Sequence, residues 1–345
     1  MTLYRTALKI FSAMLGVFIG CVVANAAPTM ITGAGATFPF PIYSKWFAEY
    51  EKVNPEVRIN YQSIGSGGGI RQLIEGTVDF GASDAPMDDA EKTKAKRPVL
   101  HVPTVLGAVV ISYNLDLPKP LRLDSDAIAG IFLGQIKKWN DPALAKLNPD
   151  LKLPEKDIVL VTRSDGSGTT AVFTDYLAKV SPAFKEKVGA GKSVQWPVGV
   201  GAKGNEGVSG MVKQTPGSLG YIELVYALNN RMAVANVKNS GGKFIEPSSK
   251  SVSAAAAPVV KQMIANEFQL SITNSSGKDA YPISSFTWIL LQEKISKEKG
   301  EKLQGFLKWA LGKSGQAMAE DLYYAPLPKA LSASVLKKVE QLKFE

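Results

Sequence analysis

Apolar side chains recur along this chain with two different periods, and each period predicts one type of secondary structure. Tyr43, Trp46, Phe47 and Tyr50 stand at positions i, i+3, i+4 and i+7, which is the spacing of one helix face. The same spacing predicts two further helices, at 70–74 and 172–177.

Strands are predicted between these helices. Val57, Ile59 and Tyr61 alternate with polar residues, and short apolar runs at 78–82 and 158–162 predict two more strands. Strands and helices therefore alternate, which favours α/β domains, each with a mostly parallel central sheet flanked by helices. In such folds, ligands bind beyond the carboxyl ends of the strands.

Three glycine-containing segments, 33–39, 65–69 and 165–169, run directly into predicted helices. Backbone N–H groups at a helix start have no intrahelical partner, so with nearby hydroxyls they can hold an oxyanion without a lysine or a metal. Arg163 lies two residues before the third segment, and Asp84 follows a predicted strand in a tight turn. The set suggests one anion contacted from several sides.

Each motif also has a purely structural explanation, which the sequence leaves open. Asp165 could form a β-turn with Thr169 as the cap of the next helix, and Asp84 could cap a turn. The run 65–69 lacks the Gly-Lys-Ser/Thr ending of a nucleotide P-loop, so it does not predict a nucleotide site. The single histidine, His101, lies in a strand-like apolar run and is interpreted as structural.

The N-terminus has the pattern of a secretory signal peptide, predicted to span residues 1–26. Arg5 and Lys9 precede an apolar run at 10–23, and an A-x-A cleavage site ends at Ala26. The run contains Cys21, the only cysteine, so the exported chain has no disulfide. Acylation at Cys21 would need a lipoprotein signal, and Phe18 fits poorly where such signals carry leucine, so no lipid anchor is expected there.

Length and charge narrow the class of protein further. Removal of residues 1–26 leaves 319 of the 345 residues, which favours two domains, and 45% of the chain is apolar, as in a folded globular protein. The formal charge of +9 falls to about +7 without Arg5 and Lys9. Lysines alternate with glutamates, as in 293–302, which favours a solvated surface over a nucleic-acid or membrane partner. No later apolar run is long enough to cross a bilayer, so a soluble exported product is expected.

Several motifs together resemble the periplasmic phosphate-binding proteins of phosphate ABC transporters. The resemblance covers nearly the whole exported chain, and it is carried by seven segments: 32–39, 65–69, 78–86, 134–139, 163–169, 217–223 and 281–285. It implies two α/β domains joined by a double-crossover hinge, with phosphate enclosed between them. Aligned on the motifs, the crossings fall near Pro103-Thr104 and 282–284, so the implied domains are 27–104 plus 284–345, and 105–283.

The resemblance also implies a ligand set without catalytic residues, metal or cofactor. Eight residues match the family's phosphate contacts: Thr37, Phe38, Ser66, Asp84, Arg163, Ser167, Gly168 and Thr169. Asp165 matches the residue that pairs with the arginine. The implied partners are inorganic phosphate and the membrane permease subunits of the transporter, and the expected form is a periplasmic monomer that binds no nucleic acid.

The chemistry of these residues suits a protonated oxyanion. Hydroxyls, backbone N–H groups and the fork of Arg163 donate to anion oxygens, whereas an ionised Asp84 only accepts and so needs the proton of phosphate. Sulfate is the alternative ligand of the same class, and it offers no proton at neutral pH. A secreted phosphoesterase with Ser66 or Ser167 as nucleophile is the alternative from another class, but the sequence offers no matching base, metal cluster or G-x-S-x-G motif.

Overall fold

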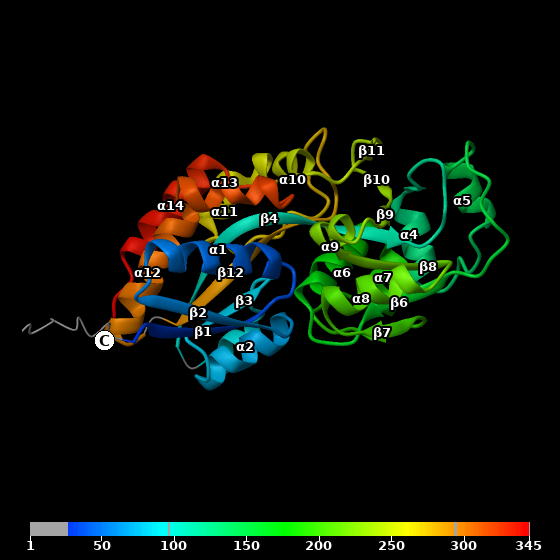
Figure 1. The fold of residues 1–345 in the computed structure, drawn as a ribbon. Coiled ribbons are helices and arrows are strands. Elements are labelled where there is room, and N and C mark those ends of the chain that lie inside the picture. The colour runs from blue at the N-terminus through cyan, green and yellow to red at the C-terminus, as the bar shows by residue number, and fades with distance from the viewer. Residues whose placement is uncertain (1–26, 96, 293–294, 345) are drawn as a thin grey trace, which may run out of the picture.

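A long strand, β4 (Val99–Tyr113), runs through both halves of the molecule and organises the fold (Figure 1). The computed structural model describes residues 27–95, 97–292 and 295–344, so the predicted signal peptide and Cys21 lie outside the described residues. The first part of β4 pairs antiparallel with β12 (Ser284–Gln292), and its last part pairs antiparallel with β8 (Ser218–Glu223). In the described part of the chain, nine strands form this sheet, in the order β2 (Val57–Ser63), β1 (Thr29–Gly35), β3 (Phe80–Ser83), β12, β4, β8, β6 (Val159–Arg163) and β7 (Val200–Ala202), with β9 (Ala233–Val234) beside β4.

The first lobe contains both termini of the described chain and three parallel strands. β1 (Thr29–Gly35) pairs parallel with β2 (Val57–Ser63) and with β3 (Phe80–Ser83), and β3 adjoins β12. Helix α2 lies on one side of these strands, and α1 and α12 lie on the other (Figure 1). The helices of this lobe are α1 (Phe40–Val53), α2 (Ser66–Glu75), α3 (Asp89–Lys94), α12 (Lys297–Leu311), α13 (Lys313–Asp321) and α14 (Lys329–Glu340). One segment of the predicted domain 105–283 packs against β4, β12 and α14; it consists of α10 (Ser249–Ala256), η1 (Ala257–Val259) and α11 (Val260–Ala265).

The second lobe is built around β6 (Val159–Arg163), which pairs parallel with both β7 (Val200–Ala202) and β8. Its other strands are β9 (Ala233–Val234) and a small separate sheet of β5 (Arg122–Leu123), β10 (Asn236–Lys238) and β11 (Phe244–Ile245). Its helices are α4 (Ser125–Phe132), α5 (Pro142–Leu147), α6 (Gly168–Val180), α7 (Pro182–Lys187), α8 (Gly204–Gln214) and α9 (Leu224–Asn229).

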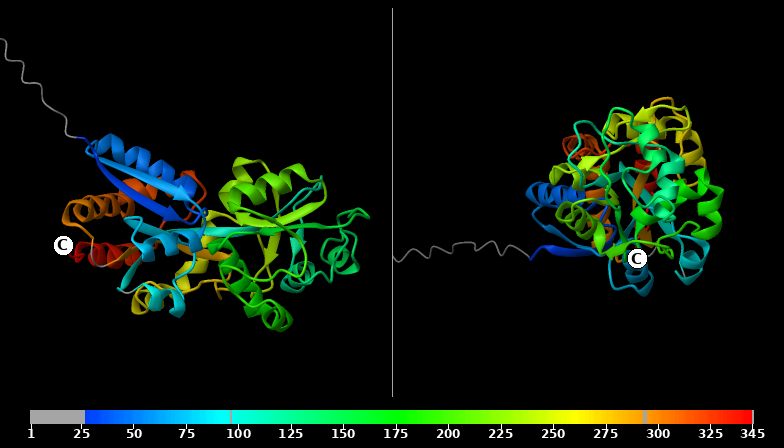
Figure 2. Two further views of the ribbon diagram at one scale, coloured as in Figure 1. Left: turned by 90° about the horizontal axis from the view of Figure 1, so that it is seen from below. Right: turned by 90° about the vertical axis from the view of Figure 1, so that its right-hand side faces the viewer.

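The chain passes between the lobes along β4 and again before β12, and the left view in Figure 2 shows the two lobes side by side and joined there. Pro103-Thr104, near which the first crossing is expected, lies at a β-bulge inside β4, because Thr287 pairs with Val105 while Trp288 pairs with Pro103. Strand β4 pairs with β12 as far as Ala108, and from Val109 onward it pairs with β8. The domain boundaries near residue 104 remain a prediction.

The predicted elements are confirmed, with small shifts at their ends. Tyr43, Trp46, Phe47 and Tyr50 all lie on α1 and are buried. The first and last of them pack in an aromatic core with β2, β3 and α12, through Tyr61, Phe80 and Phe306. In the second lobe the helix predicted at 172–177 is α6, whose buried Phe173 stacks on Tyr221 of β8 with ring centroids 4.5 Å apart.

The two-domain α/β prediction is therefore confirmed. Parallel ladders lie in each lobe, and antiparallel ladders lie where β4 and β12 cross. The carboxyl ends of β1, β2, β3 and β6 lead into the three glycine segments and the Asp84 turn, which places these motifs at one edge of the sheet.

Candidate functional site

Three helices begin where the lobes face each other. Helices α1 and α2 belong to the first lobe, and α6 belongs to the second. The loops touch directly, because Gly67 N donates to the carbonyl oxygen of Gly166 at 2.9 Å. Gly65 has a φ of 89°, and a side chain there would meet the carboxylate of Asp165 and the Gly166 oxygen, so this position requires glycine. The three glycine segments thus meet around one point between the lobes.

The first lobe contributes four of the predicted site residues. Thr37 and Phe38 lie between β1 and α1, Ser66 is the first residue of α2, and Asp84 follows β3; all four are buried. Asp84 N donates to Ser66 Oγ at 3.3 Å, which holds these two residues together. The carbonyl oxygen of Phe38 accepts from the hydroxyl of Tyr324 at 2.6 Å, which anchors the loop to the C-terminal part of the lobe.

Asp84 is a buried carboxyl that faces the other lobe. Its Oδ1 accepts from Thr287 Oγ1 of β12 at 2.8 Å, and a side chain on Gly168 of α6 would collide with Oδ2. Burial raises the pKa of Asp84 to about 7, although the Thr287 hydrogen bond and the charge of Arg163 oppose this rise. The ionised form of Asp84 offers only hydrogen-bond acceptors, so it favours a neighbouring group that carries a hydrogen.

The second lobe contributes Arg163, whose side chain is buried at the end of β6. Its Nε and Nη2 donate to the two carboxylate oxygens of Asp165 at 2.8 and 2.6 Å, and Nη1 donates to Thr169 Oγ1 at 3.3 Å. This pairing lowers the pKa of Asp165 against the opposing effect of burial. A guanidinium has five N–H groups, so one on Nη1 and one on Nη2 remain for an anion. Asp165 therefore fixes the fork that Arg163 can present.

The start of α6 supplies hydroxyl and backbone donors. Ser167 is its N-cap, because Ser167 Oγ accepts from Thr170 N at 3.0 Å, and its own O–H hydrogen stays free to donate. Gly168 and Thr169 are the first two helical residues, whose N–H groups have no intrahelical acceptor. Gly168 lies directly against Ser66 and Asp84 of the other lobe. The structure therefore brings all eight predicted contact residues to one interlobe site.

The sequence left purely structural explanations open for Asp84, Thr169 and His101, and the hydrogen bonds of the structure bear on each of them. Asp84 does not cap its own turn; Ser83 Oγ bonds there instead, to the oxygen and nitrogen of Ala85. The cap of α6 is Ser167 rather than Thr169. His101 lies in β4, where Nε2 accepts from Met87 N at 3.1 Å, and burial lowers its pKa to about 4; both observations fit the structural interpretation.

Sequence reasoning missed several polar residues of this site. Asn205 at the start of α8 donates to the hydroxyls of both Thr37 and Thr169. The hydroxyl of Tyr226 donates to the Thr37 carbonyl oxygen at 2.5 Å, and Thr287 holds Asp84. These residues lie more than 100 positions from the first-lobe residues that they contact, so no local motif marks them. The one available signal was Gly204, the glycine directly before Asn205, which has a φ of 71° at the start of α8.

A second interlobe contact lies beside the site. Lys192 Nζ, from the second lobe, pairs with Glu91 of α3 at 2.7 Å and donates to the Pro86 carbonyl oxygen at 3.2 Å. Both side chains are mostly buried. This ion pair and the contacts around Gly168 show that the lobes are closed on each other.

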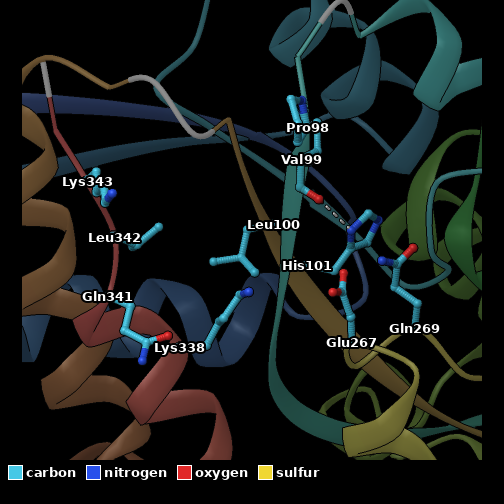
Figure 3. Close-up of a pocket in the computed structure, with 10 residues that line it drawn as sticks. All are labelled: Pro98, Val99, Leu100, His101, Glu267, Gln269, Lys338, Gln341, Leu342 and Lys343. Carbon is cyan, nitrogen blue, oxygen red and sulfur yellow. Dashed lines mark hydrogen bonds between the residues drawn. The ribbon is translucent and has the colours of Figure 1, made fainter.

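The large cavity in Figure 3 is a separate feature. It has a volume of about 850 Å³ and lies between the start of β4 and the end of α14, with Leu100, Lys338 and Gln341 among its lining. None of the site residues lines it. Among the described residues, no cluster of three or more His, Cys, Asp or Glu side chains has metal-binding geometry. No helix within the described ranges is long and apolar enough to span a bilayer.

Comparisons with known proteins agree with this architecture. The model of the PBP superfamily domain matches residues 22–314. The phosphate-binding protein PstS of Xylella fastidiosa (strain Temecula1) is 48% identical over 305 residues, covering 87% of this chain and 82% of that protein. The phosphate-binding protein PstS of Haemophilus influenzae is 44% identical over 313 residues, covering 90% and 92% of the two chains.

A solved structure shows the same fold. A high-affinity periplasmic phosphate-binding protein, PfluDING, solved with bound phosphate, superposes with a TM-score of 0.72 at 22% identity, covering 89% of this chain and 93% of that one. The fold and the interlobe site define a two-lobed binding protein of the PBP superfamily. The chain belongs to the phosphate-binding protein PstS family.

Proposed function

We propose that this protein binds inorganic phosphate between its two lobes and delivers it to the membrane permease subunits of an ABC transporter for import. The observation that carries the proposal is the donor set of the site: hydroxyls, helix N-termini and one arginine fork come from both lobes, together with one buried carboxyl. The curated relatives at 44 to 48% identity are named as phosphate-binding proteins. Binding, and not catalysis, is the activity that such a site performs.

The proposed phosphate contacts are the eight predicted residues. Thr37, Phe38, Ser66 and Asp84 belong to the first lobe, and the second lobe supplies Arg163, Ser167, Gly168 and Thr169. Asp165 orients the arginine and does not touch the ligand. Phosphate keeps at least one proton near neutral pH and can donate it to Asp84, whereas sulfate cannot, so the carboxyl favours phosphate.

Further parts of the proposal follow from the same family resemblance. The domains are 27–104 plus 284–345, and 105–283, and they close around the ligand about the two crossings. The protein works in the periplasm as a monomer after removal of residues 1–26. Opening and closure of such domains require only a few backbone torsions at the crossings.

The first prediction is that phosphate stabilises the folded protein. Because a ligand that binds only the native state adds RT ln(1 + [L]/Kd), we expect about 4 kcal/mol at a thousandfold excess over Kd, seen as a rise in Tm. Calorimetry of the exported form, stripped of ligand, should show one site for phosphate and far weaker binding of sulfate. Identical melting curves and identical small-angle scattering with and without phosphate would refute the proposal.

The second prediction concerns closure. A Cβ on Gly168 would meet Ser66 Oγ and Asp84 Oδ2 and would lie 2.7 Å from Asp84 Cβ. Gly168→Ala should therefore oppose closure and raise the Kd for phosphate roughly 5- to 150-fold, the range for overpacking a tight contact. Calorimetry measures the Kd, and scattering measures how far phosphate still closes the lobes.

The matched control is Gly210→Ala. Gly210 also lies on a helix of the second lobe, and a Cβ there has no neighbour within 4 Å. This variant should bind phosphate like the parent and melt at the same or a higher temperature. Parent-like affinity in Gly168→Ala would mean that phosphate does not require the closed contact.

A further inference from the structure

Asn205 lies between two of the proposed phosphate contacts and bonds to both. It is the second residue of α8, and it is 0% exposed. Its Nδ2 donates to Thr37 Oγ1 at 2.7 Å and to Thr169 Oγ1 at 3.1 Å. Since Thr37 belongs to the first lobe and Thr169 to the second, this one amide connects the lobes at the anion site.

The orientation of the amide follows from its third partner. Glu223 N donates to Asn205 Oδ1 at 2.9 Å, and a backbone N–H can only donate. The oxygen must therefore face β8, and the NH₂ group must face the two hydroxyls. The backbone N–H of Asn205, a free donor in the first turn of α8, also points to Thr37 Oγ1 at 3.2 Å.

A count of donors and acceptors then fixes the direction in which the hydroxyls of Thr37 and Thr169 can form a further hydrogen bond. A hydroxyl oxygen has two lone pairs and one hydrogen. Thr37 Oγ1 accepts twice from Asn205, and Thr169 Oγ1 accepts once from Asn205 and once from Arg163 Nη1. With both lone pairs occupied, each hydroxyl can only donate, and an oxyanion needs only donors. Without the amide, each oxygen regains a free lone pair that repels an anion.

On the basis of the proposed function, we infer that Asn205 is a positioning residue for phosphate. It does not need to touch the anion. It holds the hydroxyls of Thr37 and Thr169 as donors to the anion, and it can hold both at once only when the lobes are closed, because Thr37 belongs to the other lobe. Closure and the correct polarity of the site are thereby coupled through one side chain.

The first test reverses the polarity of the amide. Asn205→Asp keeps the shape but presents acceptors, so the hydroxyl hydrogens turn toward residue 205 and away from phosphate. The Kd for phosphate should rise about 100-fold or more, since each lost bond to a charged group is worth roughly 10- to 150-fold.

The matched control is Asn148→Asp, also in the second lobe. Asn148 is 3% exposed and bonds only to backbone groups near α5, so this change should lower Tm without changing the phosphate Kd of the folded protein.

A second test separates positioning from packing and from charge repulsion. Asn205→Leu is neutral and similar in volume, and it should raise the Kd roughly 10-fold in the parent. In a background with Thr37→Val and Thr169→Val, which lacks both hydroxyls, the same change should leave the Kd nearly unchanged. Isothermal calorimetry measures the four values of this cycle, and the Tm of each ligand-free variant reports its folding.

The outcomes are distinguishable. Equal losses from Asn205→Leu in both backgrounds, or a parent-like Kd in Asn205→Asp, would overturn the role of Asn205 while leaving phosphate binding intact. A parent protein that binds no phosphate would overturn the proposed function and this inference together. If Asn205→Asp does not fold, the leucine cycle decides alone.

Discussion

Arg163→Ala should weaken phosphate binding by on the order of 2 to 4 kcal/mol, or about 30- to 1,000-fold in Kd. The guanidinium is buried, and Asp165 holds it through two hydrogen bonds, so its two remaining N–H groups are preorganised for the anion. Their removal leaves phosphate oxygens without donors in a water-poor site. Titration calorimetry of the ligand-free variant measures the loss.

Three variants control for other effects of this change. Arg71→Ala removes an exposed arginine on α2 and should leave the Kd unchanged. Arg163→Lys keeps the charge without the fork and should recover only part of the affinity. Asp165→Asn should have a smaller effect than Arg163→Ala, because the guanidinium stays in place. Unchanged phosphate binding in Arg163→Ala would remove Arg163 from the site.

Asp84→Asn should reduce the preference for phosphate over sulfate more than it changes phosphate binding itself. In the parent, the phosphate O–H donates to the carboxylate, whereas sulfate places two acceptors face to face. A missing bond to a charged group costs about 1.5 to 3 kcal/mol, and sites built around a ligand hydroxyl reject analogues that lack it by about 10⁴ to 10⁵. An asparagine keeps the acceptor for Thr287 and adds a donor on the side that faces Gly168. The measured quantity is the ratio of the two Kd values at one pH and ionic strength.

The same ratio should depend on pH in the parent. Burial raises the pKa of Asp84 to about 7, so below this value the carboxyl gains a proton and becomes a donor. Sulfate should then bind better, and the preference for phosphate should fall from pH 8 to pH 5. Asp84→Asn should flatten this profile, and the exposed control Asp116→Asn should not. An identical ratio in Asp84→Asn and the parent would show that selectivity resides elsewhere.

Local patterns predicted most of the elements because each pattern reports burial of one face. The spacing of Tyr43, Trp46 and Phe47 predicted α1, and these side chains are indeed buried. Element ends were less certain; the strand predicted at 78–82 is Phe80–Ser83. At Pro103-Thr104, near which a crossing is expected, the structure has a bulge in a continuous strand, because pairing with β12 holds the backbone extended on both sides of it.

The sequence by itself determined the alternating elements, the glycine segments at helix starts and, through its motifs, the chemical types that surround the site. These features depend on residues close together in the chain. Only the tertiary structure decided that Gly168 touches Ser66 and Asp84, and that Asn205 bonds to hydroxyls of both lobes. Such contacts join positions that are distant in sequence, and the burial that raises the pKa of Asp84 comes from residues that only the folded chain brings around it.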